Sequence, residues 1–172
     1  PFPDLMPAIF FDELLPRIVF LAESSPDRRA KVSACELLHS LLLYMIGRNS
    51  TDPSRNADAG GAAAAGGKKG APATNFTKLY RRLFPVMLRL ATDVDVVPKQ
   101  LFYTLTFQCI AWFTGNQAPE SPETMALLDA IVAAVGDLHS SSMRLFGARC
   151  VGEFFRWINK RISSEMTSRN TK

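Results

Sequence analysis

Three stretches of the sequence align with one another without gaps, and this internal repeat limits the possible folds more than any other feature. They are KVSACELLHSLLLYMIG from Lys31, KQLFYTLTFQCIAWFTG from Lys99 and RLFGARCVGEFFRWINK from Arg144. Their apolar residues recur at the three-and-four spacing of a helix. The starts lie 68 and 45 residues apart, and a glycine- and alanine-rich insertion accounts for the difference of 23. We therefore predict stacked helical hairpins in units of about 40–47 residues.

Helical periodicity extends over most of the chain and predicts six helices. We expect the Ser25–Pro26 pair to begin the second helix, and Asp95 and Ser121 to cap the fourth and fifth. Gly47 and Gly115 should end the second and fourth helices. No segment shows the sustained period-two alternation of a strand. The predicted helices cover residues 7–23, 26–46, 75–91, 96–114, 122–135 and 141–163.

A low-complexity stretch, GRNSTDPSRNADAGGAAAAGGKKGAPAT, separates the second and third predicted helices. Its small and polar residues bury too little apolar surface to offset the entropy cost of ordering them. We predict a flexible loop over residues 48–74. The predicted fold is all-α: an α-solenoid of about three hairpins, over residues 1–47, 75–115 and 121–163.

The stretch KLYRRLFPVMLRLATDVD places Pro85 in the middle of a predicted helix, where a proline costs about 3 kcal/mol. A bent helix that packs around its partner can offset this cost. HEAT repeats favour such a proline, followed by an aspartate near the turn and by a valine and a basic residue that open the second helix. The hairpins resemble HEAT repeats in these residues: Pro85, Asp93, Val97 and Lys99, with Pro16 in the equivalent place of the first helix.

The composition, with 47% hydrophobic residues, is typical of a packed core. No apolar run approaches the roughly 20 residues that span a bilayer, and no signal-peptide pattern is present. Because the sequence begins at Pro1 and not at Met, we expect a segment of a larger protein.

The cysteines are widely spaced, without a C-x-x-C pair, and the two histidines lie at no ligand spacing from them. These residues are Cys35, Cys109, Cys150, His39 and His139. We predict buried free thiols in a reducing compartment, and neither a disulfide framework nor a metal site.

Side chains that could support catalysis fall at positions better explained by structure. The glycine- and alanine-rich stretch lacks the order of a kinase phosphate loop, and the Lys68–Lys69 pair lacks the following Ser or Thr of a P-loop. The acidic pairs Asp93/Asp95 and Glu120/Glu123 fall at helix starts, where carboxylates cap free N–H groups. We therefore predict no catalytic residue, bound cofactor or metal ion in this segment.

Positive charge gathers at the C-terminal end. From Arg144 onward there are seven basic and two acidic residues, a sum of +5, whereas residues 1–143 sum to −1. Arg156, Lys160 and Arg161 can share one helix face. Sequence-independent contact with DNA or with an acidic protein is one interpretation, and a solvated helix face is the other.

Two tryptophans are further candidates for nucleic-acid contact, since Trp112 and Trp157 could stack on bases. They share one repeat position with Tyr44, which favours packing between helices.

Four stretches, KVSACELLHSLLLYMIG, LYRRLFPVMLRLATDVD, CIAWFTGN and ARCVGEFFRWINK, resemble the helical solenoid of the phosphatidylinositol-3-kinase-related kinases, in order through most of residues 26–165. The resemblance implies a non-catalytic segment of a very large nuclear serine/threonine kinase that joins DNA double-strand breaks by non-homologous end joining. It implies as partners the rest of the kinase, the Ku heterodimer and double-stranded DNA ends, with no membrane and no small-molecule substrate. ATP and Mg would belong to a distant kinase domain.

The alternative is a freestanding HEAT- or armadillo-type adaptor that binds a partner peptide or helix in its concave groove. A free domain needs polar ends. The first predicted helix is instead apolar nearly all round, which favours a further covering layer and a longer chain. Its apolar residues are Ile9, Phe10, Phe11, Leu14, Leu15, Ile18, Val19, Phe20 and Leu21.

Overall fold

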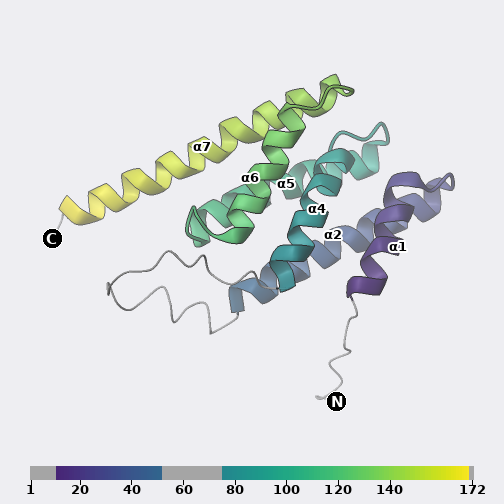
Figure 1. Cartoon of the computed structure of the whole chain (residues 1–172), viewed down its shortest axis with the longest axis horizontal. Coiled ribbons are helices and arrows are strands. Elements are labelled where there is room, and N and C mark those ends of the chain that lie inside the picture. Colours follow the sequence, from purple (N-terminus) through teal and green to yellow (C-terminus); the bar gives the residue numbers. More distant parts are fainter. Residues whose placement is uncertain (1–10, 52–74, 171–172) are drawn as a thin grey trace, which may run out of the picture.

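The structure, a computed structural model, describes residues 11–51 and 75–170 (Figure 1). These residues form helices joined by short turns, and within them no strand occurs, as predicted. Residues 1–10, most of the predicted loop (52–74) and residues 171–172 lie outside the described part. The helices are α1 (Phe11–Ser24), α2 (Arg28–Thr51), α4 (Asn75–Leu90), α5 (Val96–Asn116), α6 (Pro122–Val135) and α7 (Ser141–Asn170).

Two predicted helix starts are confirmed and one is wrong. Asp95 accepts the Val97 N–H at 3.0 Å at the start of α5, and Ser121 caps α6. The cap of α2 is not Ser25 but Asp27, whose carboxylate accepts the N–H groups of residues 29 and 30 at 3.1 and 3.3 Å. In the gapless repeat, Asp27, Asp95 and the α7 cap Ser140 occupy the same position.

The predicted helix ends at Gly47 and Gly115 are also wrong. Both glycines lie inside helices, because α2 continues to Thr51 and α5 to Asn116. A glycine inside a helix costs about 1 kcal/mol. Packing of buried neighbours, Met45 beside the first glycine and Phe113 beside the second, outweighs that cost. The sixth helix likewise continues past the predicted residue 163 to Asn170.

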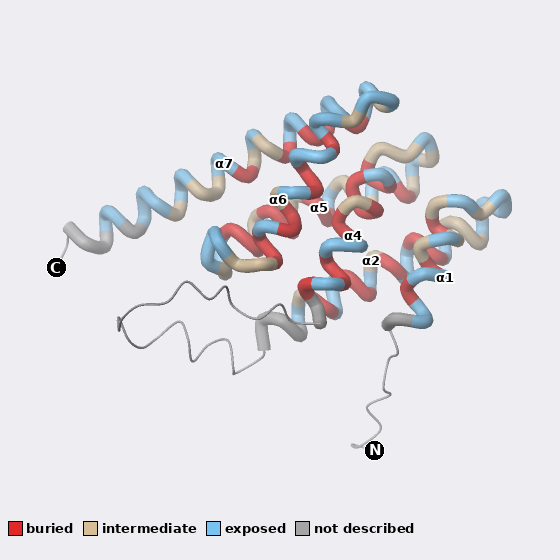
Figure 2. The backbone as a smooth tube through the Cα atoms, in the orientation of Figure 1, coloured by how far each residue is buried: buried red, intermediate tan, exposed pale blue. Residues whose placement is uncertain are grey.

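The six helices pack as three antiparallel pairs: α1 with α2, α4 with α5, and α6 with α7 (Figure 1). Each pair also contacts the next one, through α1–α4 and α2–α5 and then through α4–α6 and α5–α7. The second helices of the pairs, α2, α5 and α7, run in the same direction. Buried residues follow the facing sides of these helices (Figure 2).

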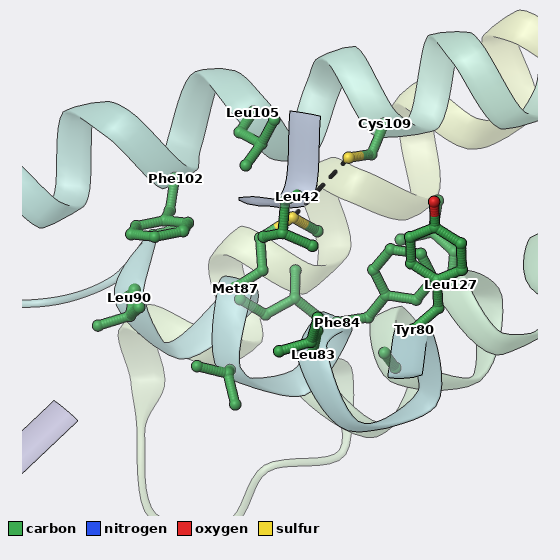
Figure 3. Close-up of a cluster of buried hydrophobic side chains, with 14 of the residues drawn as sticks. Leu42, Tyr80, Leu83, Phe84, Met87, Leu90, Phe102, Leu105, Cys109 and Leu127 are labelled. Atoms are coloured by element: carbon green, nitrogen blue, oxygen red, sulfur yellow. Dashed lines mark hydrogen bonds between the residues drawn. The ribbon is translucent and has the colours of Figure 1, made fainter. Parts of the chain in front are cut away.

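Side chains from different pairs meet in one hydrophobic cluster (Figure 3). Leu42 of α2 lies beside Met87 of α4, near Leu105 and Cys109 of α5. The Cys109 thiol lies 3.9 Å from the Met87 sulfur. Because the cluster crosses the boundaries between pairs, no pair buries its apolar surface alone.

Pro85 lies inside α4, as predicted, and directly follows Phe84, a member of an aromatic cluster. The rings of Tyr80 and Phe84 stack with centroids 5.1 Å apart, and each meets the edge of Phe113 on α5. Burying one such side chain stabilises the fold by about 1.5–3 kcal/mol. Together, these rings can offset the helix hydrogen bond that the proline cannot donate.

One glycine allows a close approach between helices. A Cβ added at Gly147 of α7 would lie 2.8 Å from the backbone nitrogen of Val135, at the end of α6. Atoms of a real side chain do not come this close to a backbone, so the spacing of α6 and α7 here requires glycine.

By length and composition, Arg28–Gly47 of α2 could span a membrane, and it is the single such segment among the described residues. This is weak evidence, because a core helix passes the same test, and 33% of this segment is buried inside the protein. The sequence prediction found no continuous apolar run of that length. The segment qualifies on average hydropathy although polar residues such as Glu36 and His39 interrupt it.

Candidate interaction surface

An ionic seam joins the first helical pair to the second at the ends of the helices. The Arg28 guanidinium contacts the Asp95 carboxylate twice, at 2.7 and 3.2 Å. Lys31 forms a 2.7 Å ion pair with Asp93, and the side chains of both residues are largely covered. A third bridge connects Arg89 of α4 with Glu23 of α1 at 2.6 Å. These contacts fix one pair against the next, so their role is structural.

The acidic residues near helix starts therefore have partners that explain them. The hydrogen bond from Arg28 and the Val97 N–H hold the pKa of Asp95 below its ordinary value of 3.8. Asp93 accepts the Asp95 N–H at 2.8 Å in addition to its ion pair. Glu123, in the first turn of α6, is buried and accepts the Thr77 hydroxyl at 2.6 Å. Carboxylates engaged in this way are not poised for acid–base chemistry.

The three cysteines are free and buried, as predicted. Burial raises the pKa of Cys35 to about 11 and the pKa values of Cys109 and Cys150 to about 12. Such thiols remain protonated near neutral pH and are poor nucleophiles. Burial also lowers the pKa of His39, whose ring meets the edge of Phe102. In the described ranges, no group of three or more His, Cys, Asp or Glu side chains could hold a metal ion.

The structure places the predicted basic residues in different surroundings. Arg161 donates to the backbone oxygens of Thr114, at 3.2 Å, and Gln117, so its guanidinium covers the C-terminal end of α5. Arg156 is exposed and forms a 3.1 Å ion pair with Glu153. Lys160 is exposed and lies 4.8 Å from the ring centre of Trp157. Of these three predicted residues, Arg156 and Lys160 thus present charge to solvent.

The repeat position that contains Tyr44 and the two tryptophans is only partly covered. Trp112 and Trp157 are half-buried against the core, and the Trp112 ring meets the edge of Phe113. Tyr44 is exposed. The tryptophans therefore serve packing, as predicted, whereas Tyr44 of the first pair is less covered than expected.

An apolar pocket of about 80 Å³ lies between α1 and α4. Sites for small molecules usually have volumes of about 300–1,000 Å³, so this pocket could take one side chain of a partner and not a metabolite. It is lined by Leu15, Pro16, Val19, Leu79, Arg82, Leu83 and Val86.

Sequence reasoning missed an exposed row of residues on α7, which we call the α7 stripe. Its members recur every three or four residues, so a heptad search would have found them. All are exposed, on the side of α7 away from the buried residues Phe146, Cys150 and Phe154. The α7 stripe consists of Leu145, Ala148, Gly152, Phe155, Asn159, Ile162 and Met166.

Comparison with known proteins identifies the family. Residues 74–172 match the family model described as DNA-dependent protein kinase catalytic subunit, CC1/2. The whole chain is 42% identical to the DNA-dependent protein kinase catalytic subunit of Gallus gallus, and 99% of it is 40% identical to that of Xenopus laevis. A relative from Dictyostelium discoideum is 42% identical over 94% of the chain.

The chain spans about 4% of the length of the first two relatives and 3% of the third. It corresponds to the helical CC1/2 region and not to a kinase domain. Since the family model covers more than half of the chain and the identities hold over nearly all of it, the chain belongs to the family of DNA-dependent protein kinase catalytic subunits.

Proposed function

We propose that this chain is a non-catalytic scaffold segment of a nuclear DNA-dependent serine/threonine protein kinase that acts in double-strand break repair by non-homologous end joining. The observation that carries the proposal is the packing: three helical pairs share one core across their boundaries and are tied by the ionic seam. Such a unit holds surfaces at fixed positions, and the ionisable groups of the ionic seam join one helical pair to the next.

The finer architecture that we propose is an α-solenoid of HEAT-like hairpins. Two observations support it. The caps of α2, α5 and α7 fall at one repeat position, and each pair contacts the next through both of its helices. In this proposal the hairpins cover about 1–47, 75–115 and 121–163, and residues 48–74 connect the first two.

In the same proposal, the segment helps to position the Ku heterodimer and double-stranded DNA ends, while ATP and Mg are held in a distant kinase domain. The exposed pair Arg156 and Lys160 is our candidate for contact with a DNA backbone. Arg161 belongs to the predicted set, but its contacts with α5 give it a structural task as well. A pair of phosphate contacts would contribute up to about 2 to the slope of log K against log salt.

The test uses the full-length kinase with Arg156→Ala and Lys160→Ala combined, and Arg161→Ala as a separate variant. Binding to duplex DNA ends is measured at two salt concentrations, with and without Ku, together with kinase activity at saturating DNA. We expect weaker binding and a shallower salt slope for the double variant, with unchanged activity once DNA saturates. An unchanged affinity and slope would remove the DNA contact. Lost activity at saturating DNA would contradict a purely scaffolding role.

A further inference from the structure

Two serines of the chain directly precede a proline, Ser25 and Ser121, and both lie in turns between helices. Proline-directed kinases phosphorylate a serine in this context, and many of them also require a basic residue three positions later. Arg28 meets this requirement after Ser25, whereas Thr124 occupies the equivalent place after Ser121. The sequence Ser-Pro-Asp-Arg at residues 25–28 therefore has both features of such a substrate.

The hydroxyl groups of the two serines have different tasks. Because Asp27 caps α2, the Ser25 hydroxyl is not needed there, and it donates to the Asp27 backbone oxygen at 3.2 Å, longer than the usual limit of about 3.0 Å. The Ser121 oxygen accepts the Thr124 N–H at 3.2 Å and lies 2.8 Å from the side-chain oxygen of Gln117. A kinase would have to break this network to reach Ser121, whereas the exposed contact of Ser25 is easily given up.

The backbone of the α1–α2 turn also suits the cleft of a kinase. Ser25 lies outside both helices, and the residues that follow it, 26–29, are exposed. Pro26 disfavours the helical conformation at the residue before it, so Ser25 is biased toward the extended backbone in which kinases bind their substrates. The Ser25 N–H bonds to the Leu21 oxygen at 3.2 Å, at the end of α1, where helices fray. Docking in a kinase thus requires only the last bond of α1 to open.

We propose that Ser25 is a phosphorylation site for a separate, proline-directed kinase. The Ser25 hydroxyl oxygen attacks the terminal phosphorus of a nucleoside triphosphate bound to that kinase. The bond to the bridging oxygen breaks, the nucleoside diphosphate leaves, and the hydroxyl proton passes to the catalytic base of the kinase. The chain gains a phosphate with a charge of about −1.5 to −2 near neutral pH. This site does not depend on the proposed function.

The new phosphate lies beside the ionic seam and competes for one of its guanidinium groups. Arg28 follows Ser25 by three residues, and its side chain is 69% exposed although it contacts Asp95. A side chain this exposed can turn toward another anion, and a phosphate dianion carries more charge than the carboxylate that it displaces. The other two bridges of the seam remain. Phosphorylation of Ser25 therefore loosens the contact between the first and second helical pairs without breaking it.

The site is tested by incubating the natural full-length protein with ATP and a cyclin-dependent kinase as the proline-directed probe. Mass spectrometry follows the phosphate at each serine, and a sample without added kinase corrects for phosphorylation by the protein itself. We expect Ser25 to react at least tenfold faster than Ser121. Arg28→Ala should slow the reaction at Ser25 at least fivefold, and the matched control Arg29→Ala should change it by less than twofold. Equal rates at the two serines, or an unchanged rate in the Arg28→Ala variant, would overturn the assignment.

The effect on the ionic seam is tested by hydrogen–deuterium exchange of the phosphorylated protein, with a Ser25→Ala protein treated in the same way as the control. Since Arg28 holds the Asp95 carboxylate that caps α5, we expect amides in the first turn of α5 to exchange at least threefold faster after phosphorylation. Arg28→Ala without phosphate should reproduce this increase, because it removes the same contact. Unchanged exchange in the phosphorylated protein would show that the phosphate does not compete for Arg28 and would overturn this part of the proposal.

Discussion

At the scale of single residues, two glycines on α7 have opposite environments. Gly147 faces the backbone of α6 so closely that no side chain fits, whereas Gly152 lies in open space on the α7 stripe. Both glycines have ordinary helical backbone conformations. If substitution of the two has different effects on stability, the difference therefore reports packing and not backbone freedom. Sequence alone could not separate them, because periodicity does not tell which face of a helix another helix covers.

We expect Gly147→Ala to destabilise the chain by about 1–3 kcal/mol, because an added methyl group must push α6 and α7 apart. The matched control is Gly152→Ala, which should stabilise it by up to about 1 kcal/mol through helix propensity. Urea unfolding followed by circular dichroism measures both changes. Similar effects of the two substitutions would mean that the close approach of α6 and α7 does not constrain residue 147.

At the scale of helices, starts are easier to predict than ends. Asp95 and Ser121 were recognised because a cap acts on N–H groups two or three residues away, within one local stretch. Asp27 was missed because the Ser25–Pro26 pair is also a typical start, although the gapless repeat places residue 27 beside Asp95. The ends at Gly47 and Gly115 were wrong because distant packing outweighs a small local cost.

Asp95 caps α5 and forms an ion pair with Arg28 of α2, so the stability that it contributes depends on pH. Its folded pKa lies below the ordinary value of 3.8, so its ionised form stabilises the fold above that pH, and the contribution is lost as pH falls through the folded pKa. We expect Asp95→Asn to lower the free energy of unfolding at pH 7, with a difference from the natural chain that shrinks in acid below pH 3.8. Asp129→Asn, on the exposed side of α6, controls for the lost charge. A difference that stays constant from pH 7 into acid would rule out this linkage.

At the scale of the whole molecule, the core lies between the helical pairs and the uncovered face lies on α7. The family, the all-α class and the helical pairs followed from periodicity and resemblance. The α7 stripe did not, because apolar spacing marks both faces of α7 and tertiary packing decides which is covered. The sequence predicted one shared helix face for Arg156, Lys160 and Arg161. In the structure Arg161 contacts α5, whereas Arg156 and Lys160 remain exposed.

Two adjacent phenylalanines distinguish the faces of α7. Phe154 is 4% exposed and Phe155 is 58% exposed. We expect Phe154→Ala to cost about 3–5 kcal/mol, because it leaves a cavity in the core. In the 172-residue chain alone, Phe155→Ala should change stability by no more than about 0.5 kcal/mol, as is usual for surface sites. Thermal and urea unfolding of the two variants measure how much stability each substitution costs. Equal losses would show that α7 is rotated relative to this description.

The length of α7 has a mechanical consequence. It contains 30 residues and its partner α6 contains 14, so at 1.5 Å per residue it extends roughly 24 Å beyond the reach of α6. In Figure 1 this end of α7 projects past the other helices. Because Arg161 holds α7 against the end of α5, the part of α7 that is free to tilt lies beyond this contact. The residues from Ile162 to Asn170 form a rod of roughly 13 Å, so a tilt of about 10° there moves its tip by about 2 Å.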